Sequence, residues 1–149
     1  MNKQGLRGKI WVLALLGAIA VILLYPFETT VVPEWKTRIV DEAGTPMRMT
    51  GVREVWRHYT IESAGHEEDS ITDNDGYVTF PKRTVRGSLL VRIGKRLLNV
   101  FNAHATVGPH AYLVVLKGPS LPDSFVTIND IYTAGQPVPT QVILKRMPH

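Results

Sequence analysis

The longest uninterrupted hydrophobic stretch of the sequence lies close to its first residue. Residues 10–25 read IWVLALLGAIAVILLY and contain no charged side chain. A helix of this length extends roughly 24 Å, and adding Pro26 and Phe27 brings it near the roughly 30 Å of a bilayer's hydrocarbon core. The pattern predicts a transmembrane helix over residues 10–27, preceded by a basic flank over residues 1–9.

Charged residues on the two sides of this stretch predict its orientation. Lys3, Arg7 and Lys9 precede it, and no acidic residue occurs before Glu28. Because basic residues stay on the cytoplasmic side, we expect a single-pass anchor in the inner membrane, with a cytoplasmic N-terminus and a periplasmic or otherwise extracytoplasmic body. A cleaved signal peptide with Ala18-Ile19-Ala20 as its processing site is the alternative. A retained signal-anchor is favoured because the apolar run continues beyond that site.

The predicted helix carries two sets of residues with expected roles. Those expected at the membrane interface are Lys9, Trp11, Tyr25, Phe27 and Trp35. Those small enough to allow close contact between helices are Ala14, Gly17, Ala18 and Ala20. The expected partners are therefore a lipid bilayer and another membrane or envelope protein.

Beyond this stretch, short runs of β-branched and alternating residues are separated by turn-forming residues. The runs that predict strands are residues 36–40, 70–72, 77–80, 89–93, 111–116, 125–128 and 141–144. This spacing predicts a mainly β fold, an antiparallel β-sandwich, with its domain over residues 36–117. Residues 28–35 are expected to form a juxtamembrane linker. Residues 118–149 are expected to form a Pro-rich C-terminal extension with one or two further strands.

Two segments between these runs require separate interpretation. The composition of residues 52–61 favours a strand with a bulge near Glu54, whereas the spacing of its apolar residues also fits an amphipathic helix. We predict the strand. Asp73, Asn74, Asp75 and Gly76 separate two short alternating runs, which is typical of a β-hairpin turn.

Two turn motifs resemble those of the carboxypeptidase regulatory-like family. The first is VDEAGTP over residues 40–46, and the second is TDNDGYVTFP over residues 72–81. The resemblance covers roughly residues 36–93 and implies a seven-stranded transthyretin-like, or prealbumin-like, sandwich. It implies no particular activity, because such domains accompany many unrelated functions.

Composition excludes several classes of function. The chain has 17 Lys and Arg against 13 Asp and Glu, and three of the basic residues belong to the basic flank. The rest of the chain is therefore close to neutral, which argues against nucleic-acid binding. The absence of cysteine excludes disulfides, zinc–thiolate sites and thiol catalysis.

Candidate metal ligands do not form a convincing motif. Asp73 and Asp75 resemble part of a calcium loop, but Lys82 stands where the loop needs an acidic ligand. His58, His104 and His110 would suit zinc or copper only if the fold brought them together. We therefore assign no catalytic, cofactor-binding or metal-binding residue and expect no cofactor.

Two further groups of side chains are candidates for binding surfaces. Basic residues between positions 82 and 96 can face an anionic lipid, a partner or solvent; they are Lys82, Arg83, Arg86, Arg92, Lys95 and Arg96. Aromatic residues suited to a sugar-binding platform or to core packing are Trp56, Tyr59, Tyr77 and Phe80.

These features together predict a non-enzymatic interaction or structural module. The favoured function is that of a membrane-anchored accessory subunit of an integral membrane complex, with its β-domain outside the cytoplasm. The alternative is a domain that binds envelope glycans or peptides. The third hypothesis is a metal-dependent enzyme that uses His58, His104 and His110 as ligands.

Overall fold

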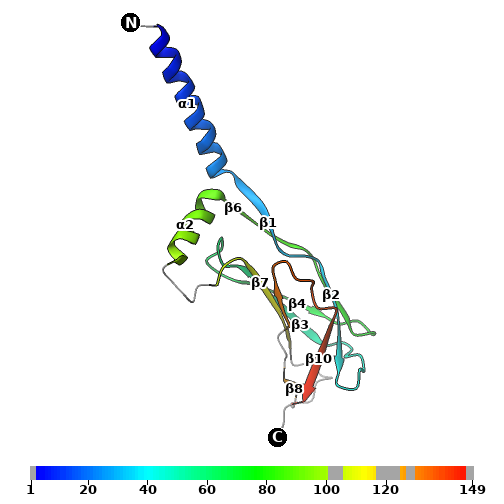
Figure 1. Ribbon diagram of the computed structural model, residues 1–149. Coiled ribbons are helices and arrows are strands. Elements are labelled where there is room, and N and C mark those ends of the chain that lie inside the picture. The colour runs from blue at the N-terminus through cyan, green and yellow to red at the C-terminus, as the bar shows by residue number, and fades with distance from the viewer. Residues whose placement is uncertain (1–2, 101–105, 117–124, 127–129, 147–149) are drawn as a thin grey trace.

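The chain was analysed as a computed structural model, which describes residues 3–100, 106–116, 125–126 and 130–146. Two helices and ten strands occur within these ranges (Figure 1). The helices are α1 (Lys3–Leu24) and α2 (Leu89–Val100). The strands are β1 (Pro26–Val32), β2 (Trp35–Asp41), β3 (Gly51–His58), β4 (His66–Ile71), β5 (Tyr77–Phe80), β6 (Arg83–Ser88), β7 (Pro109–Val115), β8 (Phe125–Val126), β9 (Asp130–Thr133) and β10 (Gln141–Arg146).

The strands form two four-stranded sheets and a separate pair. One sheet has the order β5-β2-β10-β8, and the other has the order β4-β3-β7-β9. Strands β1 and β6 pair only with each other among the described strands, and we call this pair the β1–β6 ribbon. Most neighbours are antiparallel, but β10 runs parallel to β2. The predicted mainly β fold is thus confirmed, with one mixed sheet and one antiparallel sheet.

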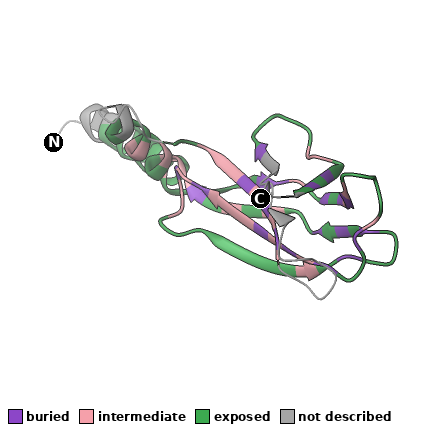
Figure 2. Cartoon of the chain, turned by 90° about the horizontal axis from the view of Figure 1, so that it is seen from below, coloured by how far each residue is buried: buried purple, intermediate pink, exposed green. Residues whose placement is uncertain are grey.

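The two sheets and the ribbon share one hydrophobic core (Figure 2). The alternation of side chains along each strand turns one set inward, as period-two geometry requires. The fully buried large members are Trp35, Phe80, Ile39, Leu113, Leu144, Val31, Val32, Val40, Val52 and Val142. Trp35 also donates a hydrogen bond from its indole nitrogen to the carbonyl of Pro139 at 2.9 Å. This burial contradicts the expected position of Trp35 at a membrane interface.

The prediction of a transmembrane helix over residues 10–27 was wrong. Within the described residues, no helix combines the length and apolar character needed to cross a bilayer. The helix ends at Leu24, and Pro26 and Phe27 begin β1, because proline disfavours helical geometry in the residue before it. The single-pass signal-anchor, the inner-membrane location and the inferred orientation are corrected with it.

Helix α1 projects away from the sheets (Figure 1). Its predicted packing residues Ala14, Gly17, Ala18 and Ala20 are all exposed. A Cβ added at Gly17 would meet no atom within 4 Å. Lys9, Trp11 and Tyr25 are exposed as well, and the Tyr25 ring meets that of Phe27 edge-on at 5.0 Å. The role of the small residues in contacts between helices stays a prediction.

Three local predictions had different outcomes. Residues 51–58 form strand β3, whose pairing with both neighbours contains no bulge near Glu54. Residues 89–93 were predicted as a strand but begin helix α2. The short run of Val and Ile resembles a strand, yet apolar residues recur at helical spacing as far as Leu98. Residues 28–35, expected as a linker, lie largely in β1.

The turn over residues 73–76 forms as its composition predicts. Asp73 Oδ1 accepts hydrogen bonds from the backbone N–H groups of Asp75 and Tyr77 at 2.9 and 2.8 Å. Gly76 has a φ of 80°, and a Cβ there would lie 2.7 Å from the carbonyl oxygen of Ile39. The flanking strands do not pair as a hairpin, however, because β4 and β5 belong to different sheets.

Candidate functional site

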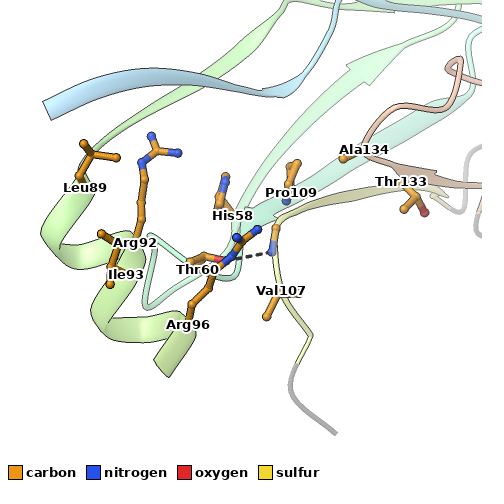
Figure 3. Close-up of a pocket in the computed structure, with 11 residues that line it drawn as sticks. His58, Thr60, Leu89, Arg92, Ile93, Arg96, Val107, Pro109, Thr133 and Ala134 are labelled. Atoms are coloured by element: carbon orange, nitrogen blue, oxygen red, sulfur yellow. Dashed lines mark hydrogen bonds between the residues drawn. The ribbon is translucent and has the colours of Figure 1, made fainter. Parts of the chain in front are cut away.

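A cavity of about 540 Å³ lies between helix α2 and one end of the β4-β3-β7-β9 sheet (Figure 3). We call it the α2 pocket. Its lining comes from four segments, which are the inner side of α2, the turn after β3, the approach to β7 and the end of β9. The lining therefore joins residues that lie far apart in the sequence.

Basic side chains of α2 attach the helix to the rest of the fold. Arg92 donates from Nε to the carbonyl of Gly87 at 3.1 Å, and from Nη2 to the carbonyl of Phe27 at 3.0 Å. It also bonds Thr29 Oγ1 at 2.5 Å. Since these acceptors lie on both strands of the β1–β6 ribbon, Arg92 positions α2 against it.

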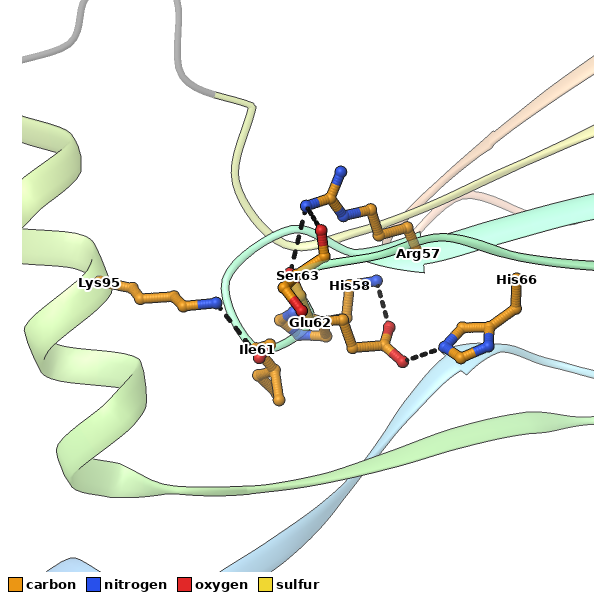
Figure 4. Close-up of polar contacts among 7 residues, drawn as sticks. All are labelled: Arg57, His58, Ile61, Glu62, Ser63, His66 and Lys95. Carbon is orange, nitrogen blue, oxygen red and sulfur yellow. Dashed lines mark hydrogen bonds and ion pairs between the residues drawn. The ribbon is translucent and has the colours of Figure 1, made fainter.

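The turn after β3 forms the floor of the pocket and is held by several polar contacts (Figure 4). The backbone N–H of His58 donates to Glu62 Oε2 at 2.7 Å, and Glu62 Oε1 lies 2.7 Å from His66 Nε2. Arg57 Nη2 donates to the carbonyls of Glu62 and Ser63 at 3.3 and 2.7 Å. These contacts place His58 and the following residues in a defined conformation.

Two further contacts join this turn to the other walls of the pocket. Lys95 Nζ of α2 donates to the carbonyl of Ile61 at 3.3 Å. Across the floor, the backbone N–H of Gly108 donates to Thr60 Oγ1 at 3.0 Å, and its carbonyl accepts from the Tyr59 N–H at 2.9 Å. Gly108 has a φ of 84°, which favours glycine at this point.

His58 presents a buried polar atom without a partner. The residue is only 5% exposed, and its Nδ1 makes no hydrogen bond with the described residues. Burial is the main cause that lowers the pKa of His58, and the charges of Arg92 and Lys95 act in the same direction. The imidazole is therefore uncharged at neutral pH, and the residue lines the pocket although its Nδ1 atom is itself buried away from the cavity.

Arg96 is the second polar group available to a ligand. Figure 3 shows its side chain reaching from α2 toward Thr60 and His58. No hydrogen bond or ion pair of Arg96 occurs within the described part of the chain, in contrast to Arg92. The described lining contains no acidic side chain. The pocket is therefore suited to an anion.

A second polar cluster on β3 is closed by its own ion pair. Glu54 is fully buried, and its Oε2 accepts from Arg83 Nε at 2.9 Å. Arg83 also pairs with Glu68 at 3.0 Å and lies 4.1 Å above the Trp56 ring. Burial raises the pKa of Glu54, although the Arg83 hydrogen bond opposes the rise. This cluster ties β6 to β3 and does not line the α2 pocket.

The structure separates most residues that sequence analysis grouped. Of the three candidate metal ligands, His104 lies outside the described residues, and His110 meets the Tyr59 ring at 6.2 Å. No group of three potential metal ligands occurs among the residues described. Of the aromatic platform, Phe80 is buried and Trp56 stacks on His66 at 5.5 Å. None of the four platform residues lines the α2 pocket.

Sequence reasoning noted the basic residues of α2 but missed the pocket. Arg92 fell in the predicted strand over residues 89–93 and Arg96 beyond its end, so nothing in that prediction placed the two side chains on one face. In a helix, positions i and i+4 share a face, so a helical assignment would have placed both residues on one side. No local signal points from them to His58, which joins them only through the fold.

Comparison with known proteins gives no family for the chain. No family model and no curated protein matches it. A solved structure that it resembles is the crystal structure of 3-chlorocatechol 1,2-dioxygenase from Rhodococcus opacus 1CP, with 13% identity and a TM-score of 0.41. The alignment covers 75% of this chain and 58% of the dioxygenase chain, and similarity at this level transfers no activity.

Two predictions are corrected by these comparisons. The assignment to the carboxypeptidase regulatory-like family is not supported, because its motifs are turn motifs whose chemistry is local. Asp41 Oδ1, for example, accepts from the N–H groups of Ala43 and Thr45 in its own turn. The prediction that the chain is not an enzyme is also withdrawn, and a similarity with a TM-score of 0.41 to a dioxygenase assigns no activity in its place.

Proposed function

We propose that the chain is a binding module whose α2 pocket accepts a small organic anion. The observation that carries this proposal is Arg96, a cation with no hydrogen bond or ion pair in the described chain, in a cavity whose described lining has no acidic residue. A guanidinium favours a carboxylate through charge-assisted hydrogen bonds.

The rest of the pocket lining is suited to a ligand whose anionic group is attached to an uncharged, apolar part. Leu89, Ile93, Val107, Pro109 and Ala134 contribute apolar surface to the lining. A volume of about 540 Å³ lies within the range typical of sites for small molecules. No aromatic side chain belongs to the described lining, which favours an organic acid or a peptide over a sugar.

The proposal can be tested with hexanoate and its neutral analogue hexanamide. Binding would be followed by chemical shifts of the backbone amides of Thr60 and Gly108 during titration of the full chain. We expect hexanoate to bind at least tenfold more tightly than hexanamide. Arg96→Met should reduce hexanoate affinity at least tenfold, because it removes the only described cation of the pocket that lacks an internal partner.

Arg86→Met is the matched control for net charge. Arg86 is exposed on β6, where it pairs with Glu28 at 3.4 Å, and does not line the pocket. This variant should bind hexanoate like the parent protein. Equal binding of hexanoate and hexanamide, or equal losses in the two Arg variants, would contradict an anion site at Arg96.

A further inference from the structure

Strand β9 provides a sheet edge that leads directly to the α2 pocket. It is the last strand of the β4-β3-β7-β9 sheet, and no described strand pairs with its outer side. The other edge of β9 is hydrogen-bonded to β7, with a register that runs from Leu113↔Asp130 to His110↔Thr133. Thr133, at the end of the strand, lines the pocket together with Ala134.

The side chain of Tyr132 anchors β9 in the hydrophobic core. Tyr132 is 8% exposed, and its ring centroid lies 6.4 Å from that of Trp35. An anchored edge strand presents unpaired backbone groups at fixed positions, and an extended peptide can add to such an edge as a new strand. The edge and the pocket therefore form one continuous surface.

The opposite edge of the same sheet is unsuited to an anionic peptide end. Strand β4 carries Glu67, Glu68 and Asp69 in succession, and such charges discourage pairing at an edge. Glu62 lies before β4, in the turn at that end of the sheet. A carboxylate approaching along β4 would meet three acidic residues in succession, whereas β9 contains one, Asp130, at the end of the strand that lies away from the pocket.

We infer that the anion bound by the α2 pocket is the C-terminal carboxylate of a peptide that adds as a strand beside β9. This inference rests on the proposed anion-binding function. Because β9 runs toward the pocket and the carboxylate must end there, the added strand runs parallel to β9. The last side chain of the peptide faces Val107, Pro109 and Ala134, so the ligand class is a peptide with an apolar C-terminal residue.

The test uses the full chain and the synthetic peptide acetyl-Thr-Val-Thr-Val-Val in two forms, one with a free C-terminal carboxylate and one with a C-terminal amide. Isothermal titration should show that the acid binds at least tenfold more tightly than both the amide and hexanoate. The gain over hexanoate comes from backbone hydrogen bonds along β9. Arg96→Met should remove the preference for the acid, and Arg86→Met should keep it.

N-methylation of the peptide backbone tests the strand itself. Every second N–H group of an added strand faces β9 and donates a hydrogen bond to it. A single N-methyl group at one of these positions should weaken binding at least tenfold. A single N-methyl group at one of the intervening positions, whose N–H points away from β9, should leave binding unchanged. Binding that is insensitive to N-methylation at every position would overturn the inference.

Hexanoate separates the failure of this inference from failure of the proposed function. If hexanoate binds through Arg96 but neither peptide binds more tightly than hexanoate, the inference fails and the anion pocket stands. If neither hexanoate nor the peptide acid binds, both fail.

Discussion

The inward face of β3 carries two polar residues with opposite surroundings. Glu54 and His58 lie four positions apart on the same side of the strand, and they are 0% and 5% exposed. Glu54 meets the guanidinium of Arg83, which arrives from β6. His58 forms no ion pair within the described part of the chain, and the residue lines the α2 pocket.

The difference separates a structural role from a binding role. Burying a charge is tolerated when an opposite charge and hydrogen bonds compensate it, and then the pair serves to hold elements together. Glu54 Oε1 and His58 Nδ1 are alike in lacking a hydrogen-bond partner within the described chain. What distinguishes His58 is that it forms no ion pair in the described chain and lines the cavity, where a ligand can contact its ring. This reasoning assigns the Glu54 cluster to assembly of the β1–β6 ribbon and the His58 cluster to binding.

Breaking the Glu54 cluster should have the largest effect. Arg83→Met leaves the buried carboxylate of Glu54 without its cation, so we expect the free energy of unfolding to fall by about 3 kcal/mol. Urea denaturation followed by circular dichroism measures this change. The hexanoate affinity of the folded fraction should stay within twofold of the parent protein, because Arg83 does not line the pocket.

A second substitution checks the cause of that loss. In the double variant Glu54→Leu with Arg83→Met, both charges are absent, and much of the lost stability should return. Arg53→Met supplies a comparison at an exposed pair, since Arg53 bonds Asp69 at 2.6 Å on the outer side of β3. A small loss for Arg83→Met, equal to that for Arg53→Met, would show that the Glu54 cluster does not hold the ribbon.

Most of the β-structure could be predicted from the sequence because it rests on local pattern. Alternation of apolar and polar residues identified the regions of β2, β5 and β10, and turn residues marked the ends of strands. The bend at residues 73–76 was likewise predictable, because the Asp73 side chain caps its own turn. The pairing of the flanking strands with different sheets was not, since it depends on distant partners such as β2 for β5.

The candidate site was largely hidden from sequence reasoning for the same reason. Its parts come from α2, the turn after β3, the approach to β7 and the end of β9, and no motif spans them. The misassignment of residues 89–93 as a strand also separated Arg92 from Arg96. For α1, hydrophobicity was clear, but the helix ends at Leu24 where Pro26 begins a strand, and the predicted length was therefore too great.

Changing His58 should affect binding more than stability. His58→Phe keeps a ring of similar shape but removes both ring nitrogens, so we expect hexanoate affinity to fall about tenfold, which corresponds to about 1.4 kcal/mol. His58→Asn retains a polar side chain near the same place and should lose less. Titration calorimetry measures both. If His58→Phe bound hexanoate as tightly as the parent protein, the imidazole nitrogens would not contact the ligand.

The smallest expected effect is a pair of opposite pH dependences, which sharpens the contrast between the two clusters. The pKa of Glu54 is raised from 4.5 in the folded state, mainly by burial. Glu54 therefore binds a proton more tightly in the folded protein than in the unfolded chain. The stability that protonated Glu54 contributes is present below pH 4.5 and is lost as pH rises through its folded pKa. The pKa of His58 is lowered from 6.5, also mainly by burial. Its contribution is present above pH 6.5 and is lost as pH falls through the folded pKa.

Removing each group should therefore flatten a different limb of the stability curve. Glu54→Gln should reduce the decline on the side above pH 4.5, and His58→Asn should reduce the decline on the side below pH 6.5. Urea denaturation at closely spaced pH values, with each variant compared with the parent protein, measures both slopes.

Saturating hexanoate should weaken the loss of stability below pH 6.5 in the parent protein, because an anion beside His58 favours its protonated form and raises its pKa. Hexanoate should leave the limb governed by Glu54 unchanged, because that carboxylate is already paired with Arg83 away from the pocket. A ligand effect on the Glu54 limb instead would mean that the two clusters are coupled, and the division between a structural and a binding role on β3 would fail.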